Sequence, residues 1–451
     1  MERSITEELL AWKNDPRRKP LILRGMRQCG KTWALKDFGR RHYRNLAYLS
    51  FDEHPEYSDF FKTSKDPARI VQNLTIALRQ PIDPGETLLV LDEIQECPEA
   101  LSALKYFQEK HPEYHVACAG SLLGIRLSGG VSFPVGKVDF LSLFPLTFSE
   151  FLRAADDGAL LGYLDTIEAL DPLPAPFFTT LHERLKLYLV TGGMPEAIAE
   201  WLDRGNVDKL ERVLSGILAS YRIDFTKHLP ATLLQKAVAV WDSLPAQLSK
   251  ENKKFRYNII KNGASAREYG EALAWLCDAQ LVHRVSRAKT PGLPLSAYDD
   301  PAAFKLYAAD VGLLRQQSHL DPSVFAEGDR LFTEFKGALA ENFVLQSLAA
   351  RAAVPLRYWS VTNPNHEVDF ILQHKNALIP IEVKAGADSR GKSLAAYKGR
   401  FAAQTPLRVH YSLLNLKFTD DLLNIPLFLV DQTPRLIDLA LTQQRTFHIT
   451  A

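Results

Sequence analysis

The residues with the most specific chemistry lie at 25–32, where the chain reads G-M-R-Q-C-G-K-T. The glycines of this G-x-x-x-x-G-K-[ST] spacing can adopt the tight turns that point several backbone N–H groups at one phosphate. The Lys31 ammonium can reach the β- and γ-phosphates of a nucleotide, and the Thr32 hydroxyl can join the oxygen shell of Mg²⁺. The spacing therefore predicts a site for ATP and Mg²⁺ formed by Gly25, Met26, Arg27, Gln28, Cys29, Gly30, Lys31, Thr32 and Trp33.

An acidic pair, Asp92-Glu93, ends the apolar run at 87–91. In this position Asp92 can hold Mg²⁺ through water, and Glu93 can be the catalytic residue that orients or deprotonates the attacking water. Lys31 is the second predicted catalytic residue of this site. Taken alone, the pair leaves a solvated strand end as an alternative.

Another apolar run, at 114–119, closes on Gly120-Ser121. Ligands collect at the carboxyl ends of parallel strands, so this end should lie beside Asp92. Ser121 is then a candidate γ-phosphate sensor, with a hydroxyl that caps the following turn as the alternative. Arg27 and Arg126 could stabilise charge on the phosphates, and an arginine from a neighbouring subunit of a homo-oligomer could do the same.

Near the other end of the chain, acidic and basic residues fall on predicted strands. Asp369 lies in the run 367–372, whereas Glu382 and Lys384 lie two residues apart in the run 377–384 and so point to one face. Carboxylates and a lysine buried at one edge favour a cation between them. We expect Asp369, Glu382 and Lys384 to be catalytic, with Asp369, Glu382 and Glu341 as Mg²⁺ ligands and Glu341 on a helix at 331–350. The loop and helix that follow carry basic residues that a phosphate backbone could contact, namely Arg390, Lys392, Lys398 and Arg400. A surface salt-bridge cluster on a scaffold that does not cut is the alternative.

The remaining elements are those that must position these residues. Apolar runs separated by helical segments predict a doubly wound parallel sheet, and residues 133–152 predict a strand followed by a helical lid. In the middle of the chain, a helix at 266–278 precedes two strands, which is the order of a winged helix. This helix could enter a DNA groove while Lys253, Lys254, Arg256 and Arg287 contact phosphates, or the module could only couple its neighbours.

Composition narrows the protein class. A chain of 451 residues predicts about three domains. The net charge of +1 gives no global sign of a nucleic-acid partner, so any such surface must be local. The four cysteines contain no C-x-x-C pair, which predicts reduced thiols in a cytoplasmic protein. No apolar run reaches the roughly eighteen residues of a membrane span, so no membrane partner is expected.

Several motifs together resemble a large bacterial and archaeal family of AAA-type ATPases whose C-terminal half is a domain of unknown function. They are R-G-M-R-Q-C-G-K-T, L-L-V-L-D-E-I-Q, A-G-S-L-L-G, F-P-L-T-F-S-E-F-L and T-G-G-M-P-E-A. The resemblance implies that Lys31, Thr32, Asp92 and Glu93 occupy the nucleotide and Mg²⁺ positions. The later order of helix-Glu, strand-Asp and strand-Glu-x-Lys resembles the PD-(D/E)xK endonuclease-like fold.

The predicted architecture is an α/β multidomain chain. It comprises an AAA-type P-loop ATPase with a helical lid at 1–205, a helical or winged-helix domain at 206–330, and a restriction-endonuclease-like α/β domain at 331–451. The expected function is ATP hydrolysis that controls nucleic-acid binding, with DNA favoured over RNA, and Mg²⁺-dependent cleavage by the C-terminal domain. The alternative is a nucleotide-dependent switch or scaffold whose non-cutting C-terminal domain binds a protein partner.

Overall fold

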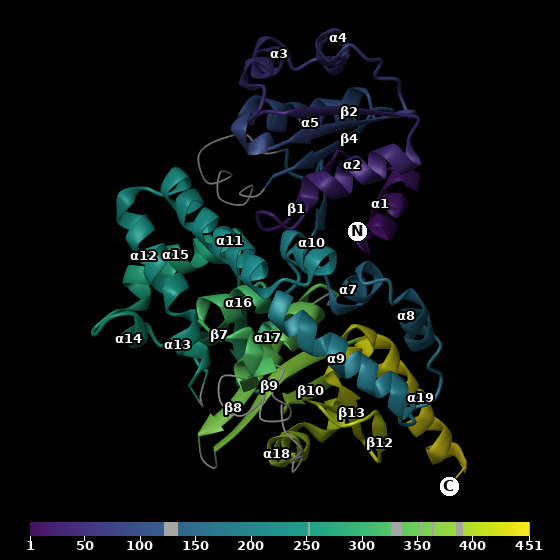
Figure 1. Cartoon of the computed structure of the whole chain (residues 1–451), viewed down its shortest axis with the longest axis vertical. Coiled ribbons are helices and arrows are strands. Elements are labelled where there is room, and N and C mark those ends of the chain that lie inside the picture. The colour runs from purple at the N-terminus through teal and green to yellow at the C-terminus, as the bar shows by residue number, and fades with distance from the viewer. Residues whose placement is uncertain are drawn as a thin grey trace. The chain divides into compact units, whose positions relative to one another are not determined.

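The computed structural model divides the chain into two compact units (Figure 1). The first is Met1–Phe144 with Asp278–Leu281, and the second is Pro145–Cys277 with Val282–Ala451. The structure describes residues 1–120, 134–250, 253–325, 336–351, 354–362, 365–384 and 391–450. Ser121 and Arg126, two residues predicted to act at the nucleotide site, lie outside the described residues.

A five-stranded sheet in the order β2-β3-β4-β1-β5 forms the centre of the first unit. All its pairings are parallel, which confirms the parallel sheet predicted from the sequence. Strand β4 pairs with both β1 and β3, so the carboxyl end of β4 lies between those of the other two strands. The strands are β1 (Leu21–Arg24), β2 (Asn45–Ser50), β3 (Thr87–Asp92), β4 (His115–Ala119) and β5 (Asp139–Ser142).

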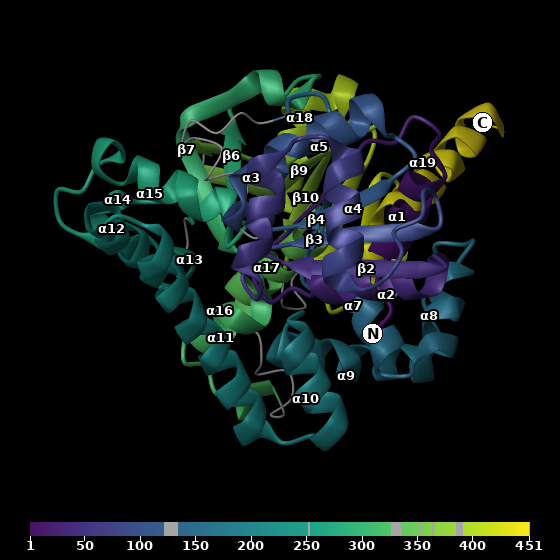
Figure 2. The ribbon, with the colours of Figure 1, turned by 90° about the horizontal axis from the view of Figure 1, so that it is seen from above.

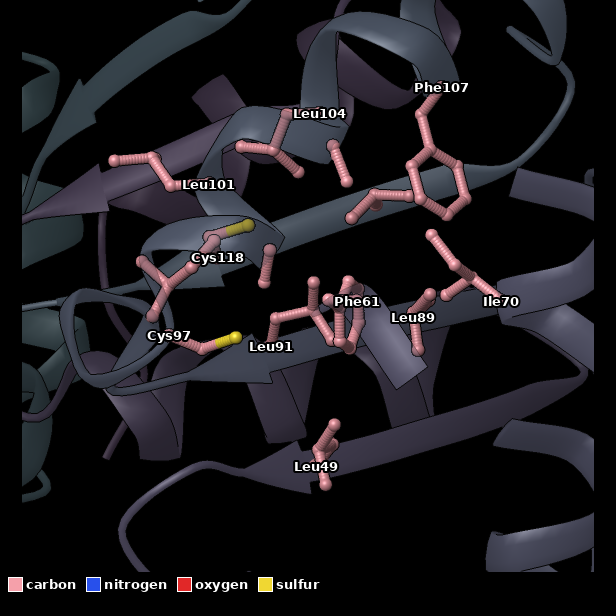
Figure 3. Close-up of a cluster of buried hydrophobic side chains, with 14 of the residues drawn as sticks. Leu49, Phe61, Ile70, Leu89, Leu91, Cys97, Leu101, Leu104, Phe107 and Cys118 are labelled. Atoms are coloured by element: carbon pink, nitrogen blue, oxygen red, sulfur yellow. The ribbon is translucent and has the colours of Figure 1, made fainter. Parts of the chain in front are cut away.

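Helices accompany this sheet, and their apolar faces form its core. In Figure 3 the side chains of Leu101 and Leu104 from one helix lie over Leu89 and Leu91 of β3. Each buried leucine contributes about 1.5–3 kcal/mol, so this core fixes where the polar ends of β1 and β3 lie. The helices are α1 (Ile5–Asn14), α2 (Lys31–His42), α3 (Asp59–Thr63), α4 (Pro67–Leu78) and α5 (Pro98–Lys110).

The second unit begins with helices. Thr147 and Glu150 form a capping box at the start of the first of them, which explains why the helix begins there. They are α7 (Phe148–Ala154), α8 (Gly158–Asp165), α9 (Ala175–Thr191), α10 (Pro195–Arg204), α11 (Val207–His228), α12 (Ala231–Asp242), α13 (Leu244–Leu248), α14 (Tyr257–Ile260), α15 (Ala266–Asp278) and α16 (Val311–Gln317).

The sequence predicts an ATPase domain with a helical lid at 1–205, and in the structure residues 145–205 belong to the second compact unit. Polar and aromatic contacts explain the difference. The backbone N–H of Gly193 donates to the Asp310 carboxylate at 2.6 Å. The ring of Tyr188 contacts Phe148 at 5.7 Å and Phe343 at 5.5 Å between ring centroids. These helices are therefore joined to elements far along the chain.

An eight-stranded mixed sheet in the order β12-β13-β11-β10-β9-β8-β6-β7 completes the second unit. Helix α17 (Lys336–Ala349) packs on β7 and β10, and α18 (Lys392–Phe401) packs on β9 and β10 (Figures 1 and 2). Helix α19 (Thr433–Thr450) ends the chain. The strands are β6 (Val282–Ala288), β7 (Asp299–Ala308), β8 (Arg357–Thr362), β9 (Asn365–His374), β10 (Ala377–Val383), β11 (Arg408–Ser412), β12 (Lys417–Thr419) and β13 (Leu422–Pro426).

The hairpin predicted as part of a winged helix is instead the edge of this sheet. Strand β6 pairs antiparallel with β7 and parallel with β8, with Ser286 opposite Arg357. Arg357 is buried and its guanidinium forms an ion pair with Asp299 at the start of β7. That ion pair ties the hairpin to the C-terminal strands, a contact that local sequence order does not reveal.

Candidate functional sites

The loop between β1 and α2 contains the predicted phosphate-binding residues. The Lys31 ammonium donates to the backbone carbonyls of Gly25 at 2.8 Å and Met26 at 2.9 Å, so the buried side chain folds back over its own loop. The N-terminus of α2 follows the same loop directly, and the N–H groups and dipole of a helix N-terminus favour a bound phosphate. The lysine and the helix N-terminus fit the phosphates of a nucleoside triphosphate.

The two loop glycines are required for different reasons. Gly30 has φ of 94°, a left-handed conformation that a residue with Cβ adopts only with strain. Gly25 is needed for space, because a Cβ there would lie 2.5 Å from the Leu143 carbonyl oxygen and 2.8 Å from the Cys29 sulfur. The sequence suggests both glycines for their tight turns, whereas the structure gives close packing as the reason at Gly25.

The other predicted loop residues differ in exposure. Met26 and Cys29 are buried, and the Cys29 thiol contacts the Leu143 carbonyl oxygen at 3.5 Å. Gln28 is exposed with φ of 63°, and Trp33 is 44% exposed on the first turn of α2. Arg27 is half-buried. The buried members shape the loop, whereas the side chains of Gln28 and Trp33 are open to solvent.

Asp92 joins the end of β3 to the phosphate loop. Its Oδ2 accepts hydrogen bonds from the Thr32 hydroxyl at 2.7 Å and from the Tyr48 hydroxyl at 2.9 Å. Its Oδ1 accepts from the backbone N–H of Glu93 at 3.0 Å. The structure thus brings together Thr32 and Asp92, the two residues predicted to hold Mg²⁺ in this unit. A hydroxyl and a carboxylate oxygen are ligands that Mg²⁺ prefers.

Glu93 follows in a left-handed conformation, with φ of 49°. Such a conformation costs a non-glycine residue on the order of 1 kcal/mol, and residues of this kind cluster at functional sites. The Gln95 side-chain amide donates to the Glu93 carboxylate and orients it. Sequence reasoning missed Gln95 and Tyr48 as partners of the acidic pair. Burial raises the pKa of the Tyr48 phenol, and the Asp92 carboxylate raises it further, so Tyr48 remains a donor.

A second acidic centre lies in the other unit, between α17 and the strands. Glu341 of α17 accepts a hydrogen bond from the Tyr307 hydroxyl at 3.1 Å through one oxygen, and the other oxygen is paired with the Lys253 ammonium. Glu341 was predicted to be a metal ligand. Both of its oxygens have protein partners here, which makes a resident cation unnecessary for its charge.

Asp369 lies on β9 and connects this strand to β10. Its Oδ2 accepts from the backbone N–H of Val383 at 2.9 Å. Its Oδ1 lies 3.9 Å from the ammonium of Lys305, a fully buried residue of β7. The Lys305 ammonium also lies 2.5 Å from Glu367, which is two residues before Asp369 and so on the same face. Sequence reasoning missed Lys305 and Glu367.

Glu382 and Lys384 lie beside each other, as their spacing predicts. The Lys384 ammonium is 3.2 Å from Glu382 Oε1, and its side chain is 49% exposed. Glu382 Oε2 is buried and takes no hydrogen bond within the part of the chain that the structure describes, and the same holds for Nε2 of His410 on the neighbouring strand β11. Among the described residues, no group of three or more His, Cys, Asp and Glu side chains is arranged to hold a metal ion.

Burial and neighbouring charge set the proton affinities of this centre. Burial raises the pKa of Asp369 to about 7, and the nearby Glu341 carboxylate adds to the shift. Burial acts to lower the pKa of Lys305, but Glu367, Glu341 and Asp369 outweigh it, and the net shift is upward. Lys305 therefore stays charged at neutral pH, although it is cut off from solvent.

Several basic residues expected at phosphates have acidic partners. Lys253 pairs with Glu341, and Arg287 donates to Asp300. Lys398 of α18 pairs with Asp421. On the same helix Lys392 and Arg400 are exposed, and the Arg400 guanidinium lies 5.5 Å from the centroid of the Trp359 ring. Arg390 lies outside the described residues.

The predicted recognition helix, α15, uses much of its surface for packing. It buries Tyr269, Leu273 and Leu276 among other residues, and its Trp275 ring contacts Phe225 of α11 at 5.2 Å between ring centroids. This packing supports a coupling or structural role for the helix. No helix among the described residues is long and apolar enough to cross a membrane.

Comparisons with known proteins match the part of the chain that contains the phosphate loop and Asp92. Residues 17–152 match the family model of an AAA domain. Residues 182–324 and 336–428 match the models of two domains of unknown function, DUF8612 and DUF4143. No protein among the curated ones gives a significant match.

Solved structures with some similarity include a Walker-type ATPase of Pyrococcus abyssi. It is 14% identical over 70% of this chain and 95% of that one, with a TM-score of 0.43. The ORC2 protein of Aeropyrum pernix in its ADP form is 12% identical over 75% of this chain and 91% of that one, with a TM-score of 0.28. The AAA match and the loop geometry together identify a P-loop ATPase domain of the AAA type in residues 17–152.

Proposed function

We propose that the first unit binds ATP with Mg²⁺ and hydrolyses it. The hydrogen bond between Thr32 and Asp92 carries this proposal, because it links the phosphate loop to the acidic end of β3. The same two groups would hold Mg²⁺, which when bound neutralises charge on the phosphate oxygens.

The remaining residues then have separate tasks. The Lys31 ammonium is a compact charge on a flexible stem. It would exchange its contacts with the Gly25 and Met26 carbonyls for contacts with phosphate oxygens. Glu93, oriented by Gln95, would position or deprotonate the attacking water. The N–H groups of the loop and of the start of α2 would bind the phosphates. The buried surroundings of Asp92 and Lys31, which are 5% and 7% exposed, strengthen these electrostatic contacts.

Phosphate release from ATP tests this proposal. The full chain should release phosphate with Mg²⁺ and stop when EDTA is added. Thr32→Ala should lose most of the activity, and Thr32→Ser, which keeps the hydroxyl, should retain it. A protein that neither binds ATP nor releases phosphate, or a Thr32→Ala variant as active as Thr32→Ser, would contradict the proposal.

For the second unit we propose a nucleotide-controlled binding module that does not cut. The lysine partners of Glu341, Glu367 and Glu382 support this choice over metal-dependent cleavage. Incubation of plasmid DNA and of RNA with the chain, ATP and Mg²⁺ or Mn²⁺ should give no nicks. Nicking that disappears in Asp369→Asn would overturn the proposal and restore the nuclease function expected from the sequence.

Nucleic-acid binding is the second candidate for this module. The exposed Lys392 and Arg400 of α18 favour it, and the Trp359 ring beneath Arg400 holds that guanidinium in place. Two such cations would give a shallow salt dependence, because few counterions are released. DNA or RNA binding should weaken in Lys392→Ala and Arg400→Ala and be unchanged in Lys398→Ala, whose ammonium is already paired. If DNA or RNA binding is unchanged in all three variants and at every salt concentration, the cations of α18 do not bind nucleic acid, and a protein partner is favoured.

A further inference from the structure

Lys305 is a charged residue within a buried apolar strand. Its neighbours Phe304 and Leu306 are buried, and Lys305 itself is 0% exposed. An ammonium without a counter-charge in such a place would lose its hydration for no gain. Its position is explained by the carboxylates that face it, with Glu367 at 2.5 Å and Asp369 at 3.9 Å.

The third carboxylate of this cluster is also compensated from within the chain. Glu341 pairs with Lys253 and accepts from the Tyr307 hydroxyl. Tyr307 and Lys305 lie two residues apart on β7, so their side chains point to one face of the strand. On that face the Tyr307 phenol meets the acid of α17, and the Lys305 ammonium meets the acids of β9. The cluster thus contains two ammonium groups, of Lys253 and Lys305, and its acids come from α17 and β9.

We infer that Lys305 is a built-in cation that takes the place of a divalent metal among Glu341, Glu367 and Asp369. A divalent cation of the Mg²⁺ type needs about six oxygen ligands at close range. These three carboxylates are engaged with Lys305, Lys253, Tyr307 and the Val383 amide instead. Glu382 Oε2 is the remaining buried carboxylate oxygen without a hydrogen bond in the described part of the centre, and it shares its carboxylate with Lys384.

The inference has two consequences that do not depend on ATP hydrolysis. The second unit should gain no stability from divalent cations, because an ammonium already balances its acids. When Lys305 is replaced by methionine, the acids lose that ammonium while the apolar stem is kept. The acids should then accept a divalent cation, and any ligand that binds only the folded state raises its stability.

Thermal unfolding of the full chain, without nucleotide, tests both consequences. Every variant is made with Asp92→Asn, so that the nucleotide site lacks its metal-binding acid. The midpoint for the otherwise unchanged chain should be equal in EDTA, Mg²⁺ and Mn²⁺. Lys305→Met should unfold several degrees lower in EDTA and recover with Mn²⁺ in a saturable way. Lys398→Met, in which a lysine outside the cluster is lost, should show no response to metal.

A triple variant keeps the test valid if Lys305→Met does not fold. Lys305→Met with Glu367→Gln and Asp369→Asn removes the ammonium together with the acids it balances. It should fold without metal and show no response to Mn²⁺. The inference is overturned if the Asp92→Asn chain with Lys305 intact is stabilised by Mn²⁺ through Asp369, or if folded Lys305→Met ignores Mn²⁺. A triple variant that also fails to fold overturns it as well, because Lys305 would then act through packing and not through charge.

Discussion

In the first unit Asp92 accepts hydrogen bonds from two hydroxyls and a backbone N–H, whereas in the second unit Glu341, Glu367 and Glu382 each face a lysine. Hydroxyls are neutral and can share a carboxylate with a metal ion. Ammonium groups already balance the negative charge. Acids at the end of a buried strand therefore suggest a metal site only when their partners inside the protein are neutral.

The buried lysine of each centre differs in the same way. Lys31 contacts only carbonyl oxygens of its own loop in the hydrogen bonds described, and these are weak partners that a phosphate can replace. Lys305 faces carboxylates at the bottom of a closed cluster. A lysine held by carbonyls is ready for an anionic ligand, whereas one held by carboxylates has a structural task.

The largest expected effect is at Lys31. Lys31→Ala removes the ammonium that would face the phosphates, so kcat/KM for ATP should fall by ~1000-fold or more. Lys36→Ala, on the same helix but with its ammonium over the Tyr48 ring, is the control and should leave the rate within about tenfold of the parent. Equal loss in both variants would mean that α2 was disturbed as a whole. Phosphate release and circular dichroism measure the two outcomes.

The next effect concerns the buried pair of Glu341 and Lys253. Removing one member leaves the other charge uncompensated, so Lys253→Met and Glu341→Gln should each lower the free energy of unfolding by about 3 kcal/mol. The double variant should cost clearly less than the sum of the single ones. Denaturant unfolding gives the free energy of unfolding of each variant. Tryptophan fluorescence reports the transition, because Trp359 is buried in this unit. Simple additivity would show that the two groups do not interact.

A smaller effect follows from the raised pKa of Asp369. Burial raises this pKa to about 7, above that of an unfolded aspartate, so the folded state binds a proton that the unfolded state releases. Stability from this residue is therefore lost as pH rises, by ~2 kcal/mol between pH 5 and 7. Asp369→Asn should remove that part of the pH dependence and be relatively more stable at pH 8. If the free energy of unfolding changes with pH in the same way in both proteins, the pKa of Asp369 is not raised.

The smallest effect is expected at Tyr48. Tyr48→Phe removes one hydrogen bond to Asp92 but leaves those from Thr32 and Glu93, so ATP hydrolysis should fall by less than about tenfold, equivalent to ~1 kcal/mol. The Mg²⁺ concentration needed for half-maximal rate should change in parallel. A loss as large as that of Lys31→Ala would mean that Tyr48 contacts the reacting groups.

The first unit was largely predictable from the sequence because its signals are local. The phosphate loop lies directly between β1 and α2, and Asp92 ends an apolar run, so spacing alone identifies both. Tyr48 was missed because its role depends on β2 lying beside β3, and nothing in the run L-A-Y-L-S-F distinguishes its hydroxyl from that of any tyrosine in a strand.

The second unit was less predictable because its contacts are distant in sequence. Lys305 lies 62 positions before Glu367 and Lys253 lies 88 positions before Glu341, so no spacing rule joins them. One signal was available. A lone lysine in the apolar strand F-K-L-Y-A must have an acidic partner if the strand is buried. An ion pair between Arg357 and Asp299 joins β8 to the start of β7, a pairing that the sequence order also hides.

Counting bound Mn²⁺ tests the central distinction most directly. With a non-hydrolysable ATP analogue, electron paramagnetic resonance should detect a single Mn²⁺ per chain, which is lost in Asp92→Asn and kept in Asp369→Asn. A second Mn²⁺, or one that survives Asp92→Asn and disappears in Asp369→Asn, would contradict the claim that the two acidic centres differ in their need for a metal ion.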